Sequence, residues 1–144
     1  MKSIKEYATI HIENSQLSEG VTKKTDFSSD CEFYEKDGIF HITYKEPSDI
    51  GTGGARVFLK IQDTSVSMRR MGEFKSVMVY ELGKTTDALY KTPFGNMDMK
   101  ISTSSIENDI SANGGILKMK YALMIGGEKI ENEMHLEIKK EQKI

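Results

Sequence analysis

The chain has 144 residues, with 38% hydrophobic and 29% charged content, and its formal net charge is -2 at pH 7. A chain of this length buries a core without disulfide or metal staples, so we expect a single domain spanning residues 1–144. The composition argues against disorder and against a membrane span. The interspersed charges lack the basic stripe of a nucleic-acid-binding protein.

Two features of the sequence favour a location in the bacterial cytoplasm. Charged side chains occupy residues 1–7, where a signal peptide needs an apolar run. Cys31 is the single cysteine, which excludes an intrachain disulfide and fits a reducing compartment. We therefore expect a cytoplasmic protein.

The N-terminal part of the chain predicts three strands. Hydrophobic and polar residues alternate over residues 4–13, which is the period-two pattern of a half-buried strand. Residues 14–24 are polar and lack periodicity, so we expect a loop there. Alternation resumes over residues 27–34 and 40–45, and Asp37-Gly38 between them supplies the positive φ angles of a hairpin turn.

A turn-rich connection follows these strands. Pro47 and three glycines lie within residues 46–54, and we expect this segment to be a flexible connection over a barrel mouth. Beyond it, residues 57–62 and 66–70 alternate as two further strands.

The next pair of strands is predicted at residues 76–82 and 85–92, with Gly83-Lys84 between them as a short hairpin turn. The turn at residues 92–95 breaks the ladder, because proline has no N–H to donate. Phe94 lies at its tip. An exposed Phe94 would indicate a contact surface or a lid, and a buried one would cap the barrel end.

The C-terminal part of the chain has the most regular alternation. Residues 97–102 predict a strand, and residues 106–110 predict a weaker, separate one. Residues 117–125 and 130–139 alternate throughout, and Gly126-Gly127 joins them as a two-residue hairpin connection.

Together these patterns predict an all-β protein. Turns recur at about the 8–12-residue spacing of a sandwich or barrel. No window of helical length shows a 3.6-residue period. The short connections favour a single antiparallel up-and-down β-barrel of about eight to ten strands, because closure removes the exposed edges. A sandwich is the alternative.

Several motifs resemble those of a known family. The sequence reads FYEKDG at residues 33–38, FHITYKE at 40–46, MRRMGE at 68–73 and YKTPFG at 90–95. In this order they are similar to the YwiB-like domain-of-unknown-function family of small bacterial proteins, over most of the chain. The resemblance implies a calycin-like, lipocalin-like β-barrel, and it implies no established activity and no catalytic residues.

No group of side chains predicts catalysis or a metal centre. His11, His41 and His135 fall on polar strand faces, with no carboxylate or cysteine at metal-ligand spacing beside them, so we interpret them as surface histidines. Cys31 shares a face with phenylalanines, which indicates a buried small hydrophobe rather than a nucleophile. We expect no cofactor, no metal and no catalytic residue.

Methionine is abundant, with nine residues, and several fall on predicted inner faces. Flexible thioether chains suit a pocket for a hydrophobic molecule. They also fill gaps in a barrel whose interior is just wide enough for side chains, and this second interpretation is favoured. If a ligand site exists, its candidate lining is Phe40, Ile42, Tyr44, Met68, Arg70, Met78, Met97, Met99, Met119 and Tyr121.

Arg70 is the one charge on a predicted inner face. A guanidinium there must be paired or must lie where water reaches it. One interpretation is an anchor at the barrel mouth for a ligand carboxylate or phosphate. The other, slightly favoured, is a structural role in which Arg70 bonds to a glutamate or to backbone carbonyls.

The function that these observations favour is non-enzymatic binding of a small apolar or amphipathic molecule inside the barrel. The alternative is a protein-interaction module with a filled core, including a homodimer. A continuous internal cavity would favour the first, and an exposed apolar strip, for instance Phe58 with Val77 and Val79, would favour the second. A third, weaker alternative is a hydrolase or isomerase that uses the Arg70 region, which has no recognisable base.

Overall fold

The computed structural model describes residues 6–140, which form ten β-strands. Residues 4 and 5, at the start of the first predicted strand, lie outside the described residues. The strands are β1 (Glu6–Ser18), β2 (Val21–Lys36), β3 (Ile39–Lys45), β4 (Arg56–Ile61), β5 (Ser65–Met71), β6 (Lys75–Glu81), β7 (Thr85–Thr92), β8 (Gly95–Ser111), β9 (Gly114–Ile125) and β10 (Glu128–Lys140).

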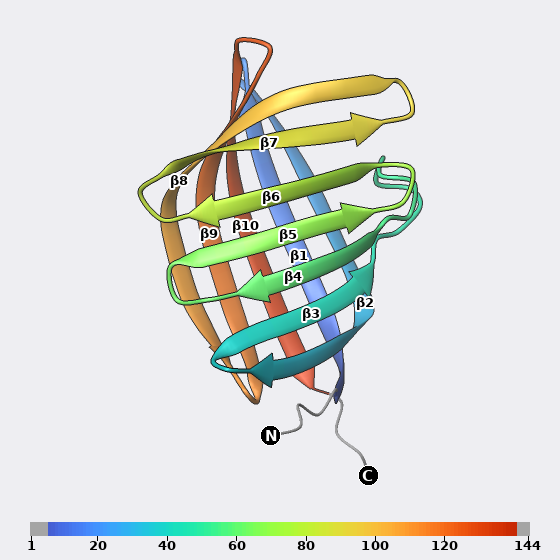
Figure 1. The fold of residues 1–144 in the computed structure, drawn as a ribbon, viewed down its shortest axis with the longest axis vertical. Coiled ribbons are helices and arrows are strands. Elements are labelled where there is room, and N and C mark those ends of the chain that lie inside the picture. The colour runs from blue at the N-terminus through green and yellow to red at the C-terminus, as the bar shows by residue number, and fades with distance from the viewer. Residues whose placement is uncertain (1–5, 141–144) are drawn as a thin grey trace.

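The strands form a closed antiparallel up-and-down barrel, which confirms the predicted architecture. Each strand pairs with its neighbours in the chain, and β1 closes the sheet by pairing with β10 from Ala8↔Lys140 to Leu17↔Glu131. The long strands β1, β9 and β10 run along the barrel, and the shorter β3 to β6 cross in front of them (Figure 1). Closure leaves the sheet without an unpaired edge strand.

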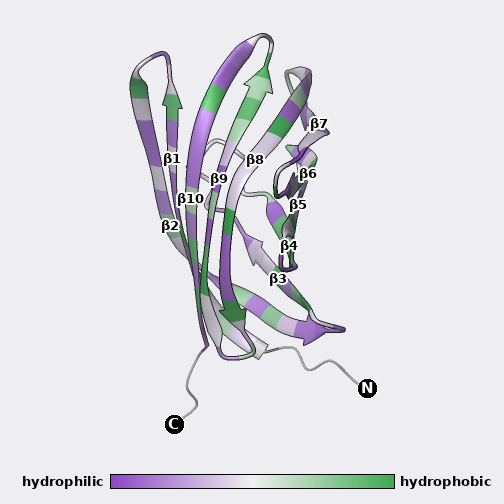
Figure 2. Ribbon diagram, turned by 90° about the vertical axis from the view of Figure 1, so that its left-hand side faces the viewer, coloured by the Kyte–Doolittle hydropathy of each residue, from purple (hydrophilic) through white to green (hydrophobic). Residues whose placement is uncertain are grey.

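Alternating side chains explain why the sheet closes around a core. Along β4 every second residue is buried, and the hydropathy colours alternate along most strands (Figure 2). The inward aliphatic and aromatic residues form one buried cluster. Asp37 and Gly38 both have positive φ, as the predicted hairpin turn requires. Among residues 6–140, no helix is long and apolar enough to cross a membrane.

The prediction of a loop at residues 14–24 is wrong. β1 continues to Ser18, β2 begins at Val21, and the two strands pair without interruption up to a turn at Glu19-Gly20. Most of the side chains of this hairpin end are partly or fully exposed. A ribbon without a buried face needs no alternation of hydrophobic and polar residues, so its sequence lacks the strand signal.

The prediction of two separate strands at residues 97–102 and 106–110 is also wrong. They belong to the single strand β8, which contains a β-bulge between Thr103 and Ser105. The buried positions change from Met99 and Ile101 before the bulge to Ile110 after it. The extra residue shifts the alternation by one position, and in the sequence this shift looks like the end of a strand.

The pair β6–β7 differs from the predicted regular hairpin. Only two residue pairs are formed between these strands, at the end away from the turn. The turn instead bonds to β8, because the Gly83 N–H donates to the Thr103 carbonyl at 2.9 Å and the Thr103 N–H donates to the Lys84 carbonyl at 3.2 Å. Near the turn, the Thr86 hydroxyl donates to the Val79 carbonyl at 2.5 Å. A side chain thus takes the place of a ladder bond.

The β8–β9 turn gives a test of the fold. Gly115 has φ +138, and a Cβ there would collide with the carbonyl oxygen of Asp109. We expect Gly115→Ala to destabilise the protein by about 3 kcal/mol or more in urea denaturation, because backbone strain and overpacking add. Gly126 is the matched control, since its φ is +56 but nothing lies near its Cβ position. Gly126→Ala should cost only about 1 kcal/mol, and equal costs would contradict the packing seen at Gly115.

Candidate functional site

A cavity of about 290 Å³ occupies part of the barrel interior. It lies between the hairpin ends of β1–β2 and β9–β10 on one side and the short strands β5 to β7 on the other, next to the β3–β4 loop. A volume near the lower end of the range for ligand pockets suits a small molecule. The lining comprises Ile12, Asn14, Gln16, Lys23, Thr25, Phe27, Tyr44, Glu46, Ile50, Thr52, Met68, Arg70, Met78, Tyr80, Tyr90, Met97, Met99, Tyr121, Leu123, Ile125, Ile130 and Met134.

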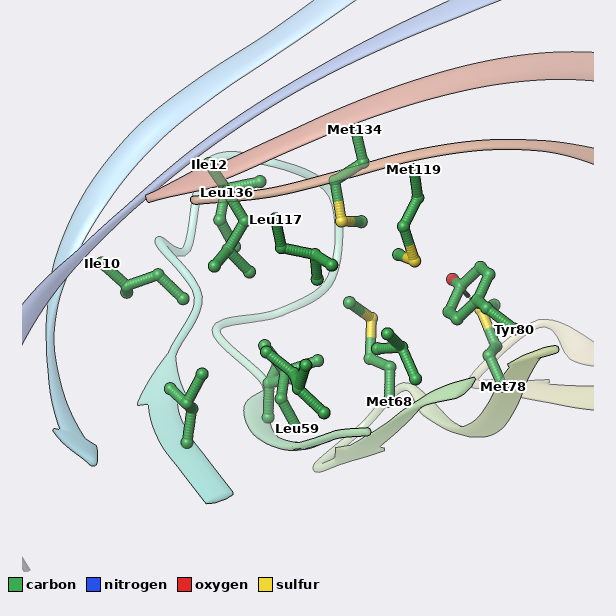
Figure 3. Close-up of a cluster of buried hydrophobic side chains, with 14 of the residues drawn as sticks. Ile10, Ile12, Leu59, Met68, Met78, Tyr80, Leu117, Met119, Met134 and Leu136 are labelled. Atoms are coloured by element: carbon green, nitrogen blue, oxygen red, sulfur yellow. Dashed lines mark hydrogen bonds between the residues drawn. The ribbon is translucent and has the colours of Figure 1, made fainter. Parts of the chain in front are cut away.

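Methionines supply much of the apolar wall. Met134 projects inward from one side of the barrel, and Met68 and Met78 project toward it from the other (Figure 3). Met97 and Met99 of β8 complete the group. Unbranched thioether chains adopt several conformations at low cost, so this wall can fit apolar ligands of different shape.

Arg70 forms a two-bonded ion pair with Glu46 in the cavity wall. Its Nε donates to Glu46 Oε1 at 2.7 Å and its Nη2 donates to Oε2 at 2.9 Å. The two side chains are only 12% and 4% exposed. Burial alone would lower the pKa of Arg70, but the hydrogen bonds and charge of Glu46 outweigh it and raise that pKa. Arg70 is therefore bonded to a glutamate, the arrangement expected for the structural interpretation.

Four tyrosines surround this pair. Burial raises the pKa of Tyr44, Tyr80, Tyr90 and Tyr121, and the negative charge of Glu46 adds to the effect for the first three. The rings of Tyr80 and Tyr121 meet edge to face, with centroids 4.6 Å apart. All four side chains therefore keep neutral hydroxyls at neutral pH, and the cavity wall has polar groups beside its methionines.

Two hydrogen bonds through Asn132 set the orientation of the Asn14 side-chain amide. Asn132 Nδ2 donates to the Ile130 carbonyl at 3.1 Å, so its Oδ1 faces Asn14 and accepts from Asn14 Nδ2 at 3.4 Å. In this orientation Asn14 Oδ1 is buried and has no hydrogen-bond partner among the described residues. Unsatisfied buried oxygens are uncommon in proteins and need an explanation.

The β3–β4 loop covers part of the cavity, as the turn-rich sequence predicted. The Glu46 N–H donates to the Ala55 carbonyl at 2.8 Å and closes the neck of the loop. Ile50 and Thr52 from the loop line the cavity. The Thr52 hydroxyl is a second buried oxygen without a partner among the described residues.

Most of the candidate lining residues are brought together at this cavity, and their role in binding remains a prediction. Those that line it are Tyr44, Met68, Arg70, Met78, Met97, Met99 and Tyr121. Phe40, Ile42 and Met119 do not line it, although Ile42 and Met119 lie on inner strand faces as predicted. Ile42 and Met119 are buried in the core, and Phe40 packs against it. Leu59, Leu117 and Leu136 pack inside the barrel on one side of these methionines (Figure 3).

Sequence reasoning missed two important polar residues. Glu46 continues the inward alternation of Ile42 and Tyr44 by one step, so extending the strand pattern would have found it. Asn14 likewise continues the inward alternation of β1, but it fell in the segment predicted as a loop. Its Asn132 partner lies far along the chain, which no local pattern reveals.

The expectation that no carboxylate lies at metal-ligand spacing beside a histidine is wrong for His11. Its Nε2 lies 3.3 Å from Glu13 Oε1 and 2.9 Å from Asp26 Oδ1, and the three side chains form a group that could hold a metal ion. Asp26 belongs to β2, so strand pairing brings it there. These side chains lie on the outer surface, where such hydrogen-bonded groups are common without an ion. Cys31 is buried, as predicted.

Of the apolar strip predicted on the outer face, Phe58 and Val77 are exposed, and Val79 is only partly exposed. Phe58, Arg69 and Val77 lie in one cross-strand row, and the Arg69 guanidinium stacks over the Phe58 ring at 5.9 Å. Phe94 is almost fully exposed at its turn, so it does not cap the barrel.

Comparisons with known proteins agree with the fold. Residues 10–138 match the family model described as "Domain of unknown function (DUF1934)". The uncharacterized beta-barrel protein YwiB of Bacillus subtilis (strain 168) is 27% identical over 120 residues, which are 83% of each chain. The crystal structure of the ywiB protein from Bacillus subtilis superposes with a TM-score of 0.86 at 23% identity, covering 96% of this chain and 94% of that chain.

The buried tyrosines predict how stability depends on pH. Their raised pKa values in the folded protein favour the neutral form, and in the unfolded chain tyrosine ionises near pH 10. We therefore expect the free energy of unfolding to be unaffected by these groups below about pH 10 and to fall above it. Each of the buried Tyr44, Tyr80 and Tyr121 lowers this free energy by about 1.4 kcal/mol per pH unit between its unfolded and folded pKa values, and the partly exposed Tyr90 lowers it by less.

Urea denaturation at a series of alkaline pH values measures this fall. Tyr121→Phe should reduce the slope of the free energy of unfolding against pH by the contribution of one tyrosine. The absorbance of tyrosinate in the urea-unfolded chain gives the pKa of tyrosine in the unfolded state. An unchanged slope in Tyr121→Phe would contradict the burial seen in the structure.

Proposed function

We propose that this chain, which belongs to the DUF1934 family as its motifs predicted, binds a small apolar or amphipathic molecule in the barrel interior. The family is a domain of unknown function, so the role must be inferred from the geometry of the chain itself. The cavity of about 290 Å³ carries this proposal. Its volume equals that of roughly ten water molecules in the liquid, which is more than a packing defect.

The number of strands supports an internal site. An eight-stranded barrel has an interior just wide enough for side chains or one small ligand, and the diameter grows with strand number. This barrel has ten strands, and a cavity remains inside it beside the packed core. The methionine wall of the cavity suits an apolar molecule, and the tyrosines suit a polar group on it.

The composition of the cavity wall favours binding over catalysis. Among the residues that line it in the described chain there is no histidine, cysteine or serine. Glu46 and Arg70 already satisfy each other, so neither acts readily as a base or a nucleophile activator. The expected location in the cytoplasm is retained as part of the proposal.

A second candidate function is protein interaction through the outer face. The row of Phe58, Arg69 and Val77 supports it, because exposed apolar side chains beside an arginine are common in interfaces. A homodimer that uses this face should become monomeric when Val77 is replaced by lysine. Native mass spectrometry of the purified protein measures this directly.

The same method tests ligand binding. We expect the native mass of protein purified gently from its own host to exceed the denatured mass by the mass of one small molecule. Met97→Trp should remove the excess, because a larger ring at this cavity position occupies the space of the ligand.

Met124 gives the matched control. It is 38% exposed, against 41% for Met97, but it lies on the outward face of β9. Met124→Trp should keep the excess mass. An excess that persists in Met97→Trp, or that disappears equally in both variants, would place the ligand outside the cavity.

A further inference from the structure

The charged residues in the cavity wall restrict the chemical class of ligand that can bind in the cavity. Resting on the proposed function, we infer that the ligand is an uncharged amphipath, an alcohol-like or amide-like molecule whose hydrogen-bond donor reaches Asn14 and whose apolar body packs on the methionines.

The buried ion pair leaves no net charge for a ligand to neutralise. Both oxygens of Glu46 accept hydrogen bonds from Arg70, and the pair is almost completely buried. A carboxylate ligand beside Arg70 would also face Glu46, and an ammonium ligand beside Glu46 would also face Arg70. Either charged group would lose its hydration without gaining a free counter-ion, which is costly in an apolar cavity.

Lys23 is the remaining charged side chain of the lining. It is exposed, so it lies at the mouth of the cavity in contact with water. Ion pairs between solvated groups contribute little to binding. Lys23 therefore gives an anionic ligand only a small advantage.

The unpartnered oxygen calls for a donor. Asn14 Oδ1 is an acceptor whose orientation is set by the bonds through Asn132 to Ile130. An alcohol or an amide N–H can donate to it, and an ionised carboxylate cannot. The Thr52 hydroxyl of the lining is also buried and without a partner among the described residues.

Three probes with one apolar body test the charge preference. Octanol, octanoate and octylamine are titrated calorimetrically into delipidated full-length protein. We expect octanol to bind at least tenfold more tightly than the other two, because the charged probes must leave water without a partner. Octanoate binding as tightly as octanol would overturn this inference and leave the proposed function standing. Binding of none of the probes would overturn both.

Octyl methyl ether tests the donor. It has the same chain but no hydrogen to donate, and we expect it to bind about tenfold more weakly than octanol. In Asn14→Leu this difference should fall sharply, because the donor of octanol then loses the Asn14 acceptor. A difference that stays the same in Asn14→Leu would show that Asn14 does not receive the donor.

Glu46→Gln tests the role of the ion pair. The amide still accepts a hydrogen bond from Arg70, but the guanidinium then carries an uncompensated positive charge. We expect octanoate to bind at least tenfold more tightly to this variant than to the unmodified protein.

Glu35→Gln makes the same change in net charge at an exposed position of β2 and should leave all affinities unchanged. Octanoate affinity that rises equally in both variants, or in neither, would overturn the inference that Glu46 excludes anions. Circular dichroism of each variant confirms that the barrel is retained.

Discussion

The pairing of β1 with β10 is the interaction on which the rest of the structure depends. It joins residues from opposite ends of the chain along ten residue pairs, from Ala8↔Lys140 to Leu17↔Glu131. Without it the sheet would have two exposed edges and no enclosed interior. With it, ten strands surround a space wider than their inward side chains fill, so a packed core and a cavity coexist in one barrel.

Inside the barrel, buried polar side chains are tolerated where their hydrogen bonds are satisfied. Arg70 and Glu46 satisfy each other through two hydrogen bonds, and loop closure at Ala55 holds the Glu46 backbone. Breaking such a pair would leave a buried charge uncompensated, which costs more than the pair contributes. Asn14 Oδ1 is different, since its orientation is fixed but its hydrogen bond is missing among the described residues. In the proposed function, this contrast separates a polar pair that completes the wall from the acceptor that a ligand would bond.

The barrel and the likeness of its motifs to one family could be predicted from the sequence, since strand alternation and hairpin turns are local properties. Two kinds of error followed from the same reasoning. The β1–β2 hairpin end was assigned to a loop because it has no buried face, and β8 was divided because its bulge shifts the alternation. Alternation correctly identified inward residues such as Ile42 and Met119, but it could not say which of them meet packed neighbours and which meet open space.

The sequence by itself determined an all-β chain, the hairpin turns at Asp37-Gly38 and Gly126-Gly127 and the inward position of Arg70, because each depends on residues close together in the chain. Only the tertiary structure decided that the barrel leaves a cavity, that Glu46 neutralises Arg70 and that Asn132 orients Asn14. Each of these depends on contacts between strands that lie far apart in sequence. Their geometry is set by barrel closure, strand stagger and a single bulge, and none of these leaves a period in the amino-acid pattern.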